Sequence, residues 1–289
     1  MTDSPAHDFD VRAAAYAPAW RIAAAVLRIF ARGSLVMTLV LLLFSSDPPT
    51  NPLRQLRLFF GLFAAPEAAA WFIARAFAAR VSLSAGSLVI EHREHRTEIP
   101  VASIAAVEPW TLPLPHGGVA LKLKSGRHFA EGLELHDPDA LAAALEAEGA
   151  SPDIRSGFDT PVAVYLRAKR ANPPGWLDHP ILKFLIFSLV PALPAFRLHQ
   201  FIAYGGTFGE YYTYGLQSYL LGFALWWTSF CLSLVVIAAG VRVVVEIVAF
   251  AVAAAAPAYA VGVRRGIEIV QHLGYYVGIP VWLLQRFLA

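Results

Sequence analysis

The chain has little charge for its length. Asp, Glu, Lys and Arg make up only 15% of its 289 residues, and 57% of the residues are hydrophobic. Soluble domains carry about 25% charged residues. This composition therefore excludes an ordinary soluble domain and predicts an α-helical integral membrane protein with a smaller water-exposed part. The mean hydropathy of +0.54 points the same way, and a net charge of +2 gives no indication of a nucleic-acid partner.

Cysteine and recognisable catalytic motifs are also scarce. The single cysteine, Cys231, excludes a disulfide within the chain and a zinc site built on several cysteines. The sequence holds no G-x-S-x-G, no P-loop and no helical His-Glu-x-x-His. The start, MTDSPAHDFDVR, lacks the pattern of a cleaved signal, so we expect the first apolar segment to remain as an anchor. We expect no catalytic residue, no cofactor and no metal.

Runs without Asp, Glu, Lys or Arg indicate transmembrane helices, which need about 20 apolar residues. The clearest run covers residues 211–241. A shorter run at 33–46 becomes long enough if Arg28 and Arg32, which precede it, reach toward the lipid headgroups. Two further spans are expected at about residues 58–79 and 181–203.

The C-terminal tail allows two interpretations. Residues 247–263 and 269–285 are each free of charge, and each is long enough for a short span or for a helix lying in the interface. Two more spans would place Arg264 and Arg265 outside the cell, against the positive-inside tendency. Both interpretations stay open, so the C-terminal domain is expected to hold two to four spans.

Residues 81–150 have a different character, with alternating apolar positions, frequent turns and more charge. VSLSAGSLVIEHR predicts a strand, a turn at Ala85-Gly86 and a second strand. RTEIPVASIAAVEP predicts two more short strands, and GVALKLKSGRHFAEGL predicts a hairpin. HDPDALAAALEAEGA predicts a helix over residues 138–148, with Asp137 as its N-cap. The segment is therefore expected to be β-rich and closed by one helix.

This order of strands and a final helix resembles the bacterial pleckstrin-homology-like domains. The resemblance is carried by VSLSAGSLVIEHREHRTEIPVASIAAVEPW, in which Ile99, Pro100, Ile104 and Val107 form the pattern IP-x-x-x-I-x-x-V. Such domains often follow a pair of transmembrane helices, as this segment does. The resemblance implies a curved, seven-stranded, partly open barrel capped by a helix. It also implies binding or assembly in place of catalysis, and it covers no part of the C-terminal half.

The stretch IEHREHRTEIP raises the question of a metal site. The metalloprotease signature places two histidines four residues apart on one helix face. His92 and His95 are three residues apart, on a predicted strand and turn. We therefore predict a hydrated hairpin tip in which neither histidine binds metal, and we expect the fold to survive replacement of both by Ala.

Charge indicates how the chain sits in a membrane. Residues 81–149 hold ten acidic and five basic residues, so this domain is a poor match for anionic lipid and a better one for a protein partner. Basic residues cluster before the first span, after the second and before the third, whereas Arg54 and Arg57 lie before the second span and count against the pattern. This pattern predicts the inner membrane of a bacterium, with the N-terminus and the β-rich domain in the cytoplasm. Loops 47–51 and 205–213 would then lie outside, and a linker at 151–178 would turn Val162, Tyr165 and Leu166 toward lipid.

Polar side chains within or beside the expected spans are the candidate site residues, because charge inside a membrane is costly and is often functional. They are Glu67, Arg197, His199, Glu210, Arg242 and Glu246. Glu67 is either a proton or substrate site or a packing lock between helices. Arg242 and Glu246 can pair on one helix face or lie at the cytoplasmic interface. The other three sit among tyrosines, in an aromatic belt or in a pocket for a lipid headgroup, a quinone or a partner helix.

Two functions follow from these patterns. The first is a non-enzymatic membrane scaffold, assembly factor or accessory subunit that contacts membrane lipids and binds a protein through its β-rich domain. The second is a small transporter or a membrane-embedded lipid-processing enzyme, which would need the six polar residues to converge on one cavity. The expected domains are residues 1–80, 81–150, 151–178 and 179–289.

Overall fold

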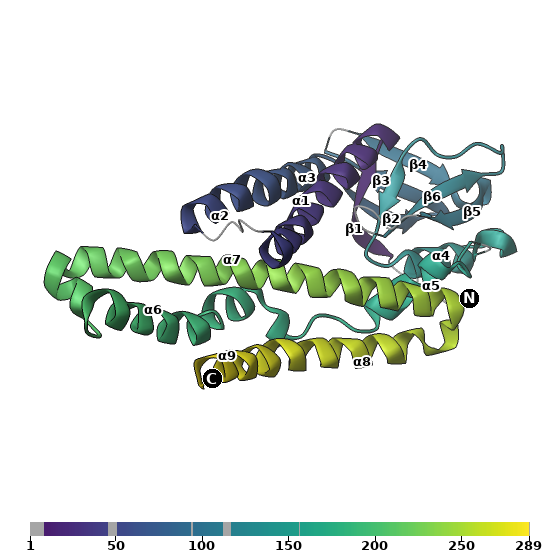
Figure 1. Ribbon diagram of the computed structural model, residues 1–289. Helices are drawn as coiled ribbons and strands as arrows, with labels where there is room; N and C mark the ends of the chain where they lie inside the picture. The colour runs from purple at the N-terminus through teal and green to yellow at the C-terminus, as the bar shows by residue number, and fades with distance from the viewer. Residues whose placement is uncertain (1–8, 46–50, 94, 112–116, 156, 289) are drawn as a thin grey trace, which may run out of the picture. The chain divides into compact units, whose positions relative to one another are not determined.

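A computed structural model describes residues 9–45, 51–93, 95–111, 117–155 and 157–288. The chain is largely helical, and its strands form one curled antiparallel sheet (Figure 1). Its contacts divide it into two compact units. The first unit holds Met1–Ile29, Pro66–Arg170 and Phe250–Ala260, and the second holds Phe30–Ala65, Ala171–Ala249 and Val261–Ala289. Two predicted features, the loop at 47–50 and Glu94 of the hairpin tip, lie outside the described residues.

The sheet in the first unit is a half-barrel of seven strands in the order β4-β3-β2-β1-β7-β6-β5. The strands are β1 Asp10–Tyr16, β2 Ala78–Ser84, β3 Ser87–Glu91, β4 Arg96–Pro100, β5 Ile104–Pro109, β6 Gly118–Leu123 and β7 Gly132–Glu134. The predicted β-rich character of residues 81–150 is confirmed, but the prediction missed β1. This strand is the centre of the sheet, because it pairs with β2 on one side and with β7 on the other.

The pairing of β1 with β2 ties the sheet to a helical hairpin. Helix α1 (Pro18–Phe44) follows β1, and the chain returns through α2 (Pro52–Leu58), a π-helical turn (Phe59–Ala64) and α3 (Ala65–Ala76) into β2. The hairpin therefore begins after β1 and ends before β2, and these two strands are neighbours in the sheet. At this pairing Arg80 Nε donates to Asp10 Oδ1 at 2.6 Å, and that hydrogen bond holds the pKa of Asp10 below its ordinary value.

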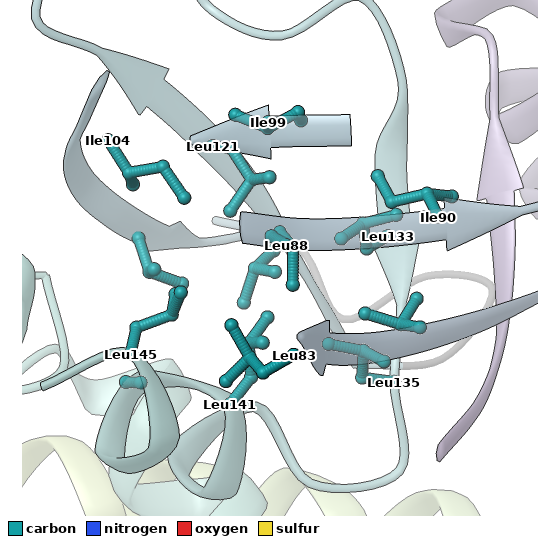
Figure 2. Packing of buried hydrophobic residues seen from close by; sticks show 14 of the residues in the cluster. Leu83, Leu88, Ile90, Ile99, Ile104, Leu121, Leu133, Leu135, Leu141 and Leu145 are labelled. Carbon is teal, nitrogen blue, oxygen red and sulfur yellow. The ribbon is translucent and has the colours of Figure 1, made fainter. Parts of the chain in front are cut away.

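The core of the half-barrel is apolar and is closed by helix α4 (Pro138–Ala147), as predicted. Alternation along β2 buries Val81 and Leu83. Leu141 and Leu145, four residues apart on α4, are fully buried against the sheet (Figure 2). Burying a leucine side chain contributes about 2 kcal/mol, so this cluster is the main source of the domain's stability.

Four helical segments of the described chain are long and apolar enough to cross a membrane. They are Pro18–Phe44, Pro52–Ala76, Ile181–Tyr204 and Gly209–Ala255, and they correspond to the four predicted spans. The last of these segments is helix α7 (Gly209–Ala255). Within it, Gly215 has a φ of 85° and a ψ of 175° and interrupts the helical geometry. At 1.5 Å per residue the helix beyond Gly215 is roughly 60 Å long, about twice the apolar thickness of a bilayer.

Of the two interpretations of the tail, a separate span at residues 247–263 is not what the structure shows. Helix α7 ends at Ala255, and a 3-10 turn at Pro257–Tyr259 separates it from helix α8 (Ala260–Leu273). A proline near a helix end removes a backbone donor and stops the helix, which explains the break. Helix α8 continues through a π-helical turn (Gly274–Gly278) into α9 (Ile279–Leu288). In the described part of the tail, no helix after α7 meets the length and hydropathy of a span.

The linker helix α5 (Pro161–Arg170) differs from its prediction in what its apolar face contacts. Val162 and Tyr165 are buried within the protein. The ring of Tyr165 lies 5.9 Å from that of Phe250, which belongs to the same unit. The expectation that Val162 and Tyr165 face lipid is therefore wrong, because both are buried and Phe250, far away in sequence, is an aromatic partner of Tyr165. Leu166, the third expected lipid-facing residue, is half-buried.

Candidate functional site

The six predicted site residues belong to both units: five lie in the second unit, at two places, and one lies in the first. Arg242 and Glu246 lie toward the C-terminal end of α7, whereas Arg197, His199 and Glu210 lie around the turn between α6 (Leu189–Tyr204) and α7. Glu67 lies on α3, in the first unit. The Glu210 carboxylate lies beside Gly222, where a Cβ would be 3.1 Å from its oxygens. Roughly 36 Å of helix, at 1.5 Å per residue, separates Gly222 from Glu246. The second unit therefore does not bring its candidate residues into one cavity.

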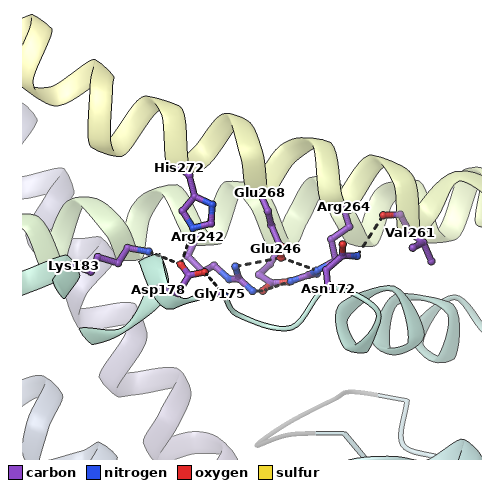
Figure 3. A network of polar contacts seen from close by, with 10 residues as sticks. All are labelled: Asn172, Gly175, Asp178, Lys183, Arg242, Glu246, Val261, Arg264, Glu268 and His272. Atoms are coloured by element: carbon purple, nitrogen blue, oxygen red, sulfur yellow. Dashed lines mark hydrogen bonds and ion pairs between the residues drawn. The ribbon is translucent and has the colours of Figure 1, made fainter. Parts of the chain in front are cut away.

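Arg242 and Glu246 belong to a quartet of charged side chains with two residues of α8 (Figure 3). Arg264 Nη1 and Nη2 donate to the two carboxylate oxygens of Glu246 at 3.0 and 3.2 Å. Arg264 Nε donates to Glu268 Oε1 at 3.1 Å. Arg242 Nη2 lies 2.7 Å from Glu246 Oε1, and Arg242 Nη1 lies 3.7 Å from Glu268 Oε1. Two cations and two anions thus neutralise each other.

Arg264 is the buried centre of this quartet. Its side chain is 0% exposed, while that of Arg242 is 41% exposed. A guanidinium presents its donors in a planar fork that matches a carboxylate, and this fork holds Glu246 here. Removing one partner of a buried ion pair strands the other charge and costs several kcal/mol. The quartet therefore fixes α8 against α7.

The sequence of α8 explains why the polar groups meet. Arg264, Glu268 and His272 recur every four residues, so they share one face of the helix. The other face carries apolar side chains that are exposed, among them Ile269 at 52% and Val270 at 67%. Helix α8 thus turns Arg264, Glu268 and His272 toward the protein and its apolar side outward, while Arg265 is exposed. This is largely the reverse of a helix packed on a soluble core.

Asp178 continues the polar contacts at the far end of that face (Figure 3). Its Oδ1 lies 3.0 Å from His272 Nε2 and accepts from Lys183 Nζ at 3.1 Å. Its other oxygen accepts the Gly175 backbone N–H at 3.3 Å. Burial opposes the charge of Asp178, but the hydrogen bonds from His272 and Lys183 outweigh it, so its pKa lies below the ordinary value. Asp178 is therefore held as an anion.

Two tyrosines in the π-helical turn that follows α8 form hydrogen bonds to the segment 177–183. Tyr275 Oη donates to the backbone oxygen of Lys183 at 2.8 Å, and Tyr276 Oη donates to that of Leu177. The Lys183 ammonium also lies 5.4 Å from the centre of the Tyr275 ring. Apolar packing of Tyr275 with Leu234 and neighbouring side chains completes the contact. Helices α7 and α8 and the segment before α6 are thus held together by polar and apolar contacts.

Sequence reasoning missed five members of this network. They are Asp178, Lys183, Arg264, Glu268 and His272. Residues 264–268 contain charges, so a prediction based on charge-free runs places a break between two apolar segments there. The signal was present as the spacing of four between Arg264, Glu268 and His272, which indicates one polar helix face.

Glu67 has a different neighbourhood. Its Oε1 lies 3.7 Å from Arg28 Nε on α1, and the Arg28 side chain is only 7% exposed. Arg28 thus faces a carboxylate, whereas the sequence prediction had it reaching toward the headgroups. Nearby, Tyr16 of β1 is fully buried. Burial and the charge of Glu134 raise the pKa of Tyr16. These contacts favour the interpretation of Glu67 as a lock between α1 and α3.

The turn between α6 and α7 is closed by a second polar contact. Gln200, which is fully buried, donates from Nε2 to Glu210 Oε2 at 2.6 Å, and its Oε1 accepts the Glu210 backbone N–H at 3.1 Å. The ring of His199 lies 5.1 Å from that of Trp226, and Arg197 is exposed. Glu210 therefore caps its own turn, and His199 packs in the aromatic surroundings that its tyrosine neighbours indicated.

The hairpin tip at IEHREHRTEIP differs in part from its prediction. His95 is exposed, as expected for a tip. The His92 side chain is only 13% exposed, and its Nε2 lies 3.5 Å from Glu131 Oε2. The expectation that both histidines are largely hydrated is wrong for His92, because β3 turns it toward the segment before β7. Among the described residues, no group of three or more His, Cys, Asp or Glu side chains is arranged to hold a metal ion.

In chemical terms these contacts hold elements together. Each of the carboxylates Glu67, Glu210 and Glu246 has a cation or a hydrogen-bond donor as its neighbour. The quartet of Arg242, Glu246, Arg264 and Glu268 balances its own charge. No protein-family model matches the chain, and no curated protein or solved structure matches it significantly.

Proposed function

We propose that the chain is a non-enzymatic membrane protein, a scaffold, assembly factor or accessory subunit, whose half-barrel binds a protein partner. One observation carries this proposal. Within the second unit, the polar residues that a transporter or membrane enzyme would gather in one cavity lie at two places, and Glu210 and Glu246 contact neighbouring helices there. Such contacts stabilise a helical frame, so the half-barrel becomes the better candidate for recognition.

A half-barrel closed by a helix is what the resemblance to the pleckstrin-homology-like domains implies, and it supports our proposal that this domain is a recognition module. Its core is closed by α4, and one edge, β5, is covered by the segment around Pro152–Arg155. A Cβ placed on Gly157 would lie 3.7 Å from the Val107 backbone oxygen, which puts this segment beside the edge. At the other edge, no described strand pairs with the outer side of β4. An unpaired edge strand is a surface to which an extended peptide can add.

The charge on this edge suggests the chemistry of the partner. Glu98 on β4 has a side chain that is 54% exposed, and Glu91 on β3 is 43% exposed. Arg96 lies between them, 2.8 Å from Glu98 and 3.4 Å from Glu91. Because the domain holds an excess of acidic residues, we propose a basic or neutral protein segment as the partner. We also propose that the N-terminus and the half-barrel are cytoplasmic, in a bacterial inner membrane.

Site-specific photo-crosslinking of the full chain in its native membrane tests this function. A photoreactive amino acid replaces Glu98 at the β4 edge, and a matched variant carries it at Glu148, an exposed residue at the end of α4. We expect one discrete protein adduct from position 98 and none from position 148. The charge-reversal variant Glu98→Lys should lower co-purification of the crosslinked protein at least tenfold, and Glu148→Lys should not.

Two outcomes would contradict the proposal. Equal adducts from both positions would mean that contact is not specific to the edge. No adduct from position 98, with adducts instead from a probe at Tyr212 in the α6–α7 turn, would move recognition to the helical part of the chain.

A further inference from the structure

We propose that the β4 edge of the half-barrel pairs with the same edge of a second copy of this chain. The inference rests on the proposed function, because it identifies the neutral protein segment that binds at this edge as a second β4. Strand β4 is the last strand on its side of the sheet, and no described strand pairs with its outer side. An edge strand can extend its sheet through the backbone groups that point outward.

The hydrogen bonds between β3 and β4 show which backbone groups point outward. His92 N donates to His95 O at 2.8 Å, so position 95 bonds toward β3. Positions that bond to the same neighbour recur at every second residue of an antiparallel strand. Position 101, whose N–H donates to Gly86 O at 2.9 Å, follows the same alternation. The backbone N–H and C=O groups of Arg96 and Glu98 therefore point away from β3, toward the open edge.

The side chains at these two positions carry opposite charges. Arg96 and Glu98 are two residues apart on a strand, so they project from the same face of the sheet. Their side chains are 56% and 54% exposed, and Arg96 Nη2 lies 2.8 Å from Glu98 Oε1. Each of the two positions thus offers a backbone donor, a backbone acceptor and a charge, and the segment as a whole is neutral.

One register of self-pairing satisfies both the backbone and the charges. In an antiparallel pair of β4 strands centred on Thr97, Arg96 of each copy lies opposite Glu98 of the other. Each opposed Arg96 and Glu98 can then exchange both backbone hydrogen bonds. A shift of two residues in either direction keeps the backbone groups facing, but it places Arg96 opposite Arg96 or Glu98 opposite Glu98. Unlike charges opposite each other stabilise a strand pair, and like charges destabilise it.

The limits of the edge favour two copies over a longer assembly. Pro100, the last residue of β4, has no N–H to donate, so it cannot extend the new ladder. The pair is two-fold symmetric and uses the same edge of each copy, so it is closed at two chains. A short ladder binds weakly by itself. Under the proposed membrane placement both copies are confined to one bilayer, and this confinement raises their effective concentration.

Charge reversal in two differently tagged full chains tests the pairing in native membranes. Glu98→Arg leaves two arginines on the edge, and Arg96→Glu leaves two glutamates. We expect co-purification of two identically substituted chains to fall about tenfold for either variant, because like charges then face each other. Co-expression of a Glu98→Arg chain with an Arg96→Glu chain should restore co-purification to about the wild-type level, because unlike charges meet again.

Glu148→Arg, at an exposed position outside the edge, is the matched control and should co-purify as the wild type does. Recovery in the mixed pair also shows that both variants fold. No recovery in the mixed pair, or an equal loss in Glu148→Arg, would overturn the inference.

A disulfide locates the two-fold axis. Thr97→Cys in a Cys231→Ser background places two thiols across the axis, where opposite residues have Cα atoms about 4.5 Å apart, a distance that a disulfide can bridge. Mild oxidation of native membranes should give a covalent dimer for Thr97→Cys and monomer for Glu148→Cys in the same background. Equal dimer from both positions, or none from Thr97→Cys, would contradict the register.

Failure of this inference and failure of the proposed function give different results. We expect the photo-adduct from position 98 to have the mass of two chains. An adduct with a different protein, together with no recovery in the mixed pair, would overturn the second copy and leave recognition at the edge in place. No adduct from position 98 would overturn both.

Discussion

The half-barrel and the C-terminal helices distribute polarity in opposite ways. In the half-barrel, Leu121 and Leu133 are fully buried, and charged residues such as Glu98 are exposed. Around α8, Arg264 is fully buried, whereas Val270 is 67% exposed. One physical rule accounts for both arrangements under the proposal of a membrane protein, in which the sheet meets water and the helices meet an apolar phase.

The largest expected effect comes from breaking the buried ion pair. Glu246→Leu leaves Arg264 without its bidentate partner, and we expect the free energy of unfolding to fall by about 3–5 kcal/mol. The double variant Glu246→Leu with Arg264→Met removes both charges and should recover most of that loss. Chemical unfolding in mild detergent measures both. A single variant that costs less than about 1 kcal/mol would show that Arg264 does not depend on Glu246.

The apolar core of the half-barrel gives the next effect. Leu121→Ala creates a cavity among fully buried side chains and should cost about 3 kcal/mol. Leu220→Ala on α7 changes a side chain that is 53% exposed, so we expect about 0.5 kcal/mol or less in detergent. Unfolding of the two variants under identical conditions tests the contrast. Equal losses would contradict the assignment of their surroundings.

Acid should loosen the segment before α6 at Asp178. The folded pKa of Asp178 is lowered, so its contribution to stability is complete above the unfolded value of about 3.9 and is lost as pH falls through the folded pKa. Asp178→Asn should remove this pH dependence and cost about 1 kcal/mol at neutral pH. Thermal unfolding between pH 3 and 7 measures it. If the wild type and Asp178→Asn lose stability equally as the pH falls, Asp178 is not the source of the acid sensitivity.

The smallest effects are expected at the hairpin tip. His92→Ala removes a side chain that is 13% exposed beside Glu131, and it should cost about 0.5–1 kcal/mol. His95→Ala, at an exposed position, should change stability by about 0.5 kcal/mol or less. Thermal unfolding with and without a chelator separates these values from loss of a structural metal, which would cost several kcal/mol. A chelator-sensitive melt that disappears in His95→Ala would contradict the prediction.

The sequence predicted those elements whose signal is local. The charge-free run at 211–241 and the capped segment after Asp137 each specify a helix from neighbouring residues alone. Strand β1 could not be found this way. Its sequence, DVRAAAY, is rich in alanine and has weak alternation. Its partners β2 and β7 lie far away in sequence, so only tertiary pairing makes it a strand.

The candidate site was predictable only in part, for the same reason. Arg242 and Glu246 are four residues apart on one helix, and their pairing could be foreseen. Their further partners, Arg264 and Glu268, come from another helix. When each segment is considered alone, the charge of Arg264 indicates the end of a span. It becomes a buried partner only when two helices meet, which no local pattern specifies.

The most direct test of the account compares partner binding in two full-chain variants. One is Glu98→Lys at the edge of the half-barrel, and the other is the paired Glu246→Leu with Arg264→Met in the helices. We measure the crosslinked partner that co-purifies from native membranes. The account predicts at least a tenfold loss for Glu98→Lys and binding near the wild-type level for the paired variant. Full binding in Glu98→Lys, with loss in the paired variant, would show that recognition resides in the helices and would contradict the account.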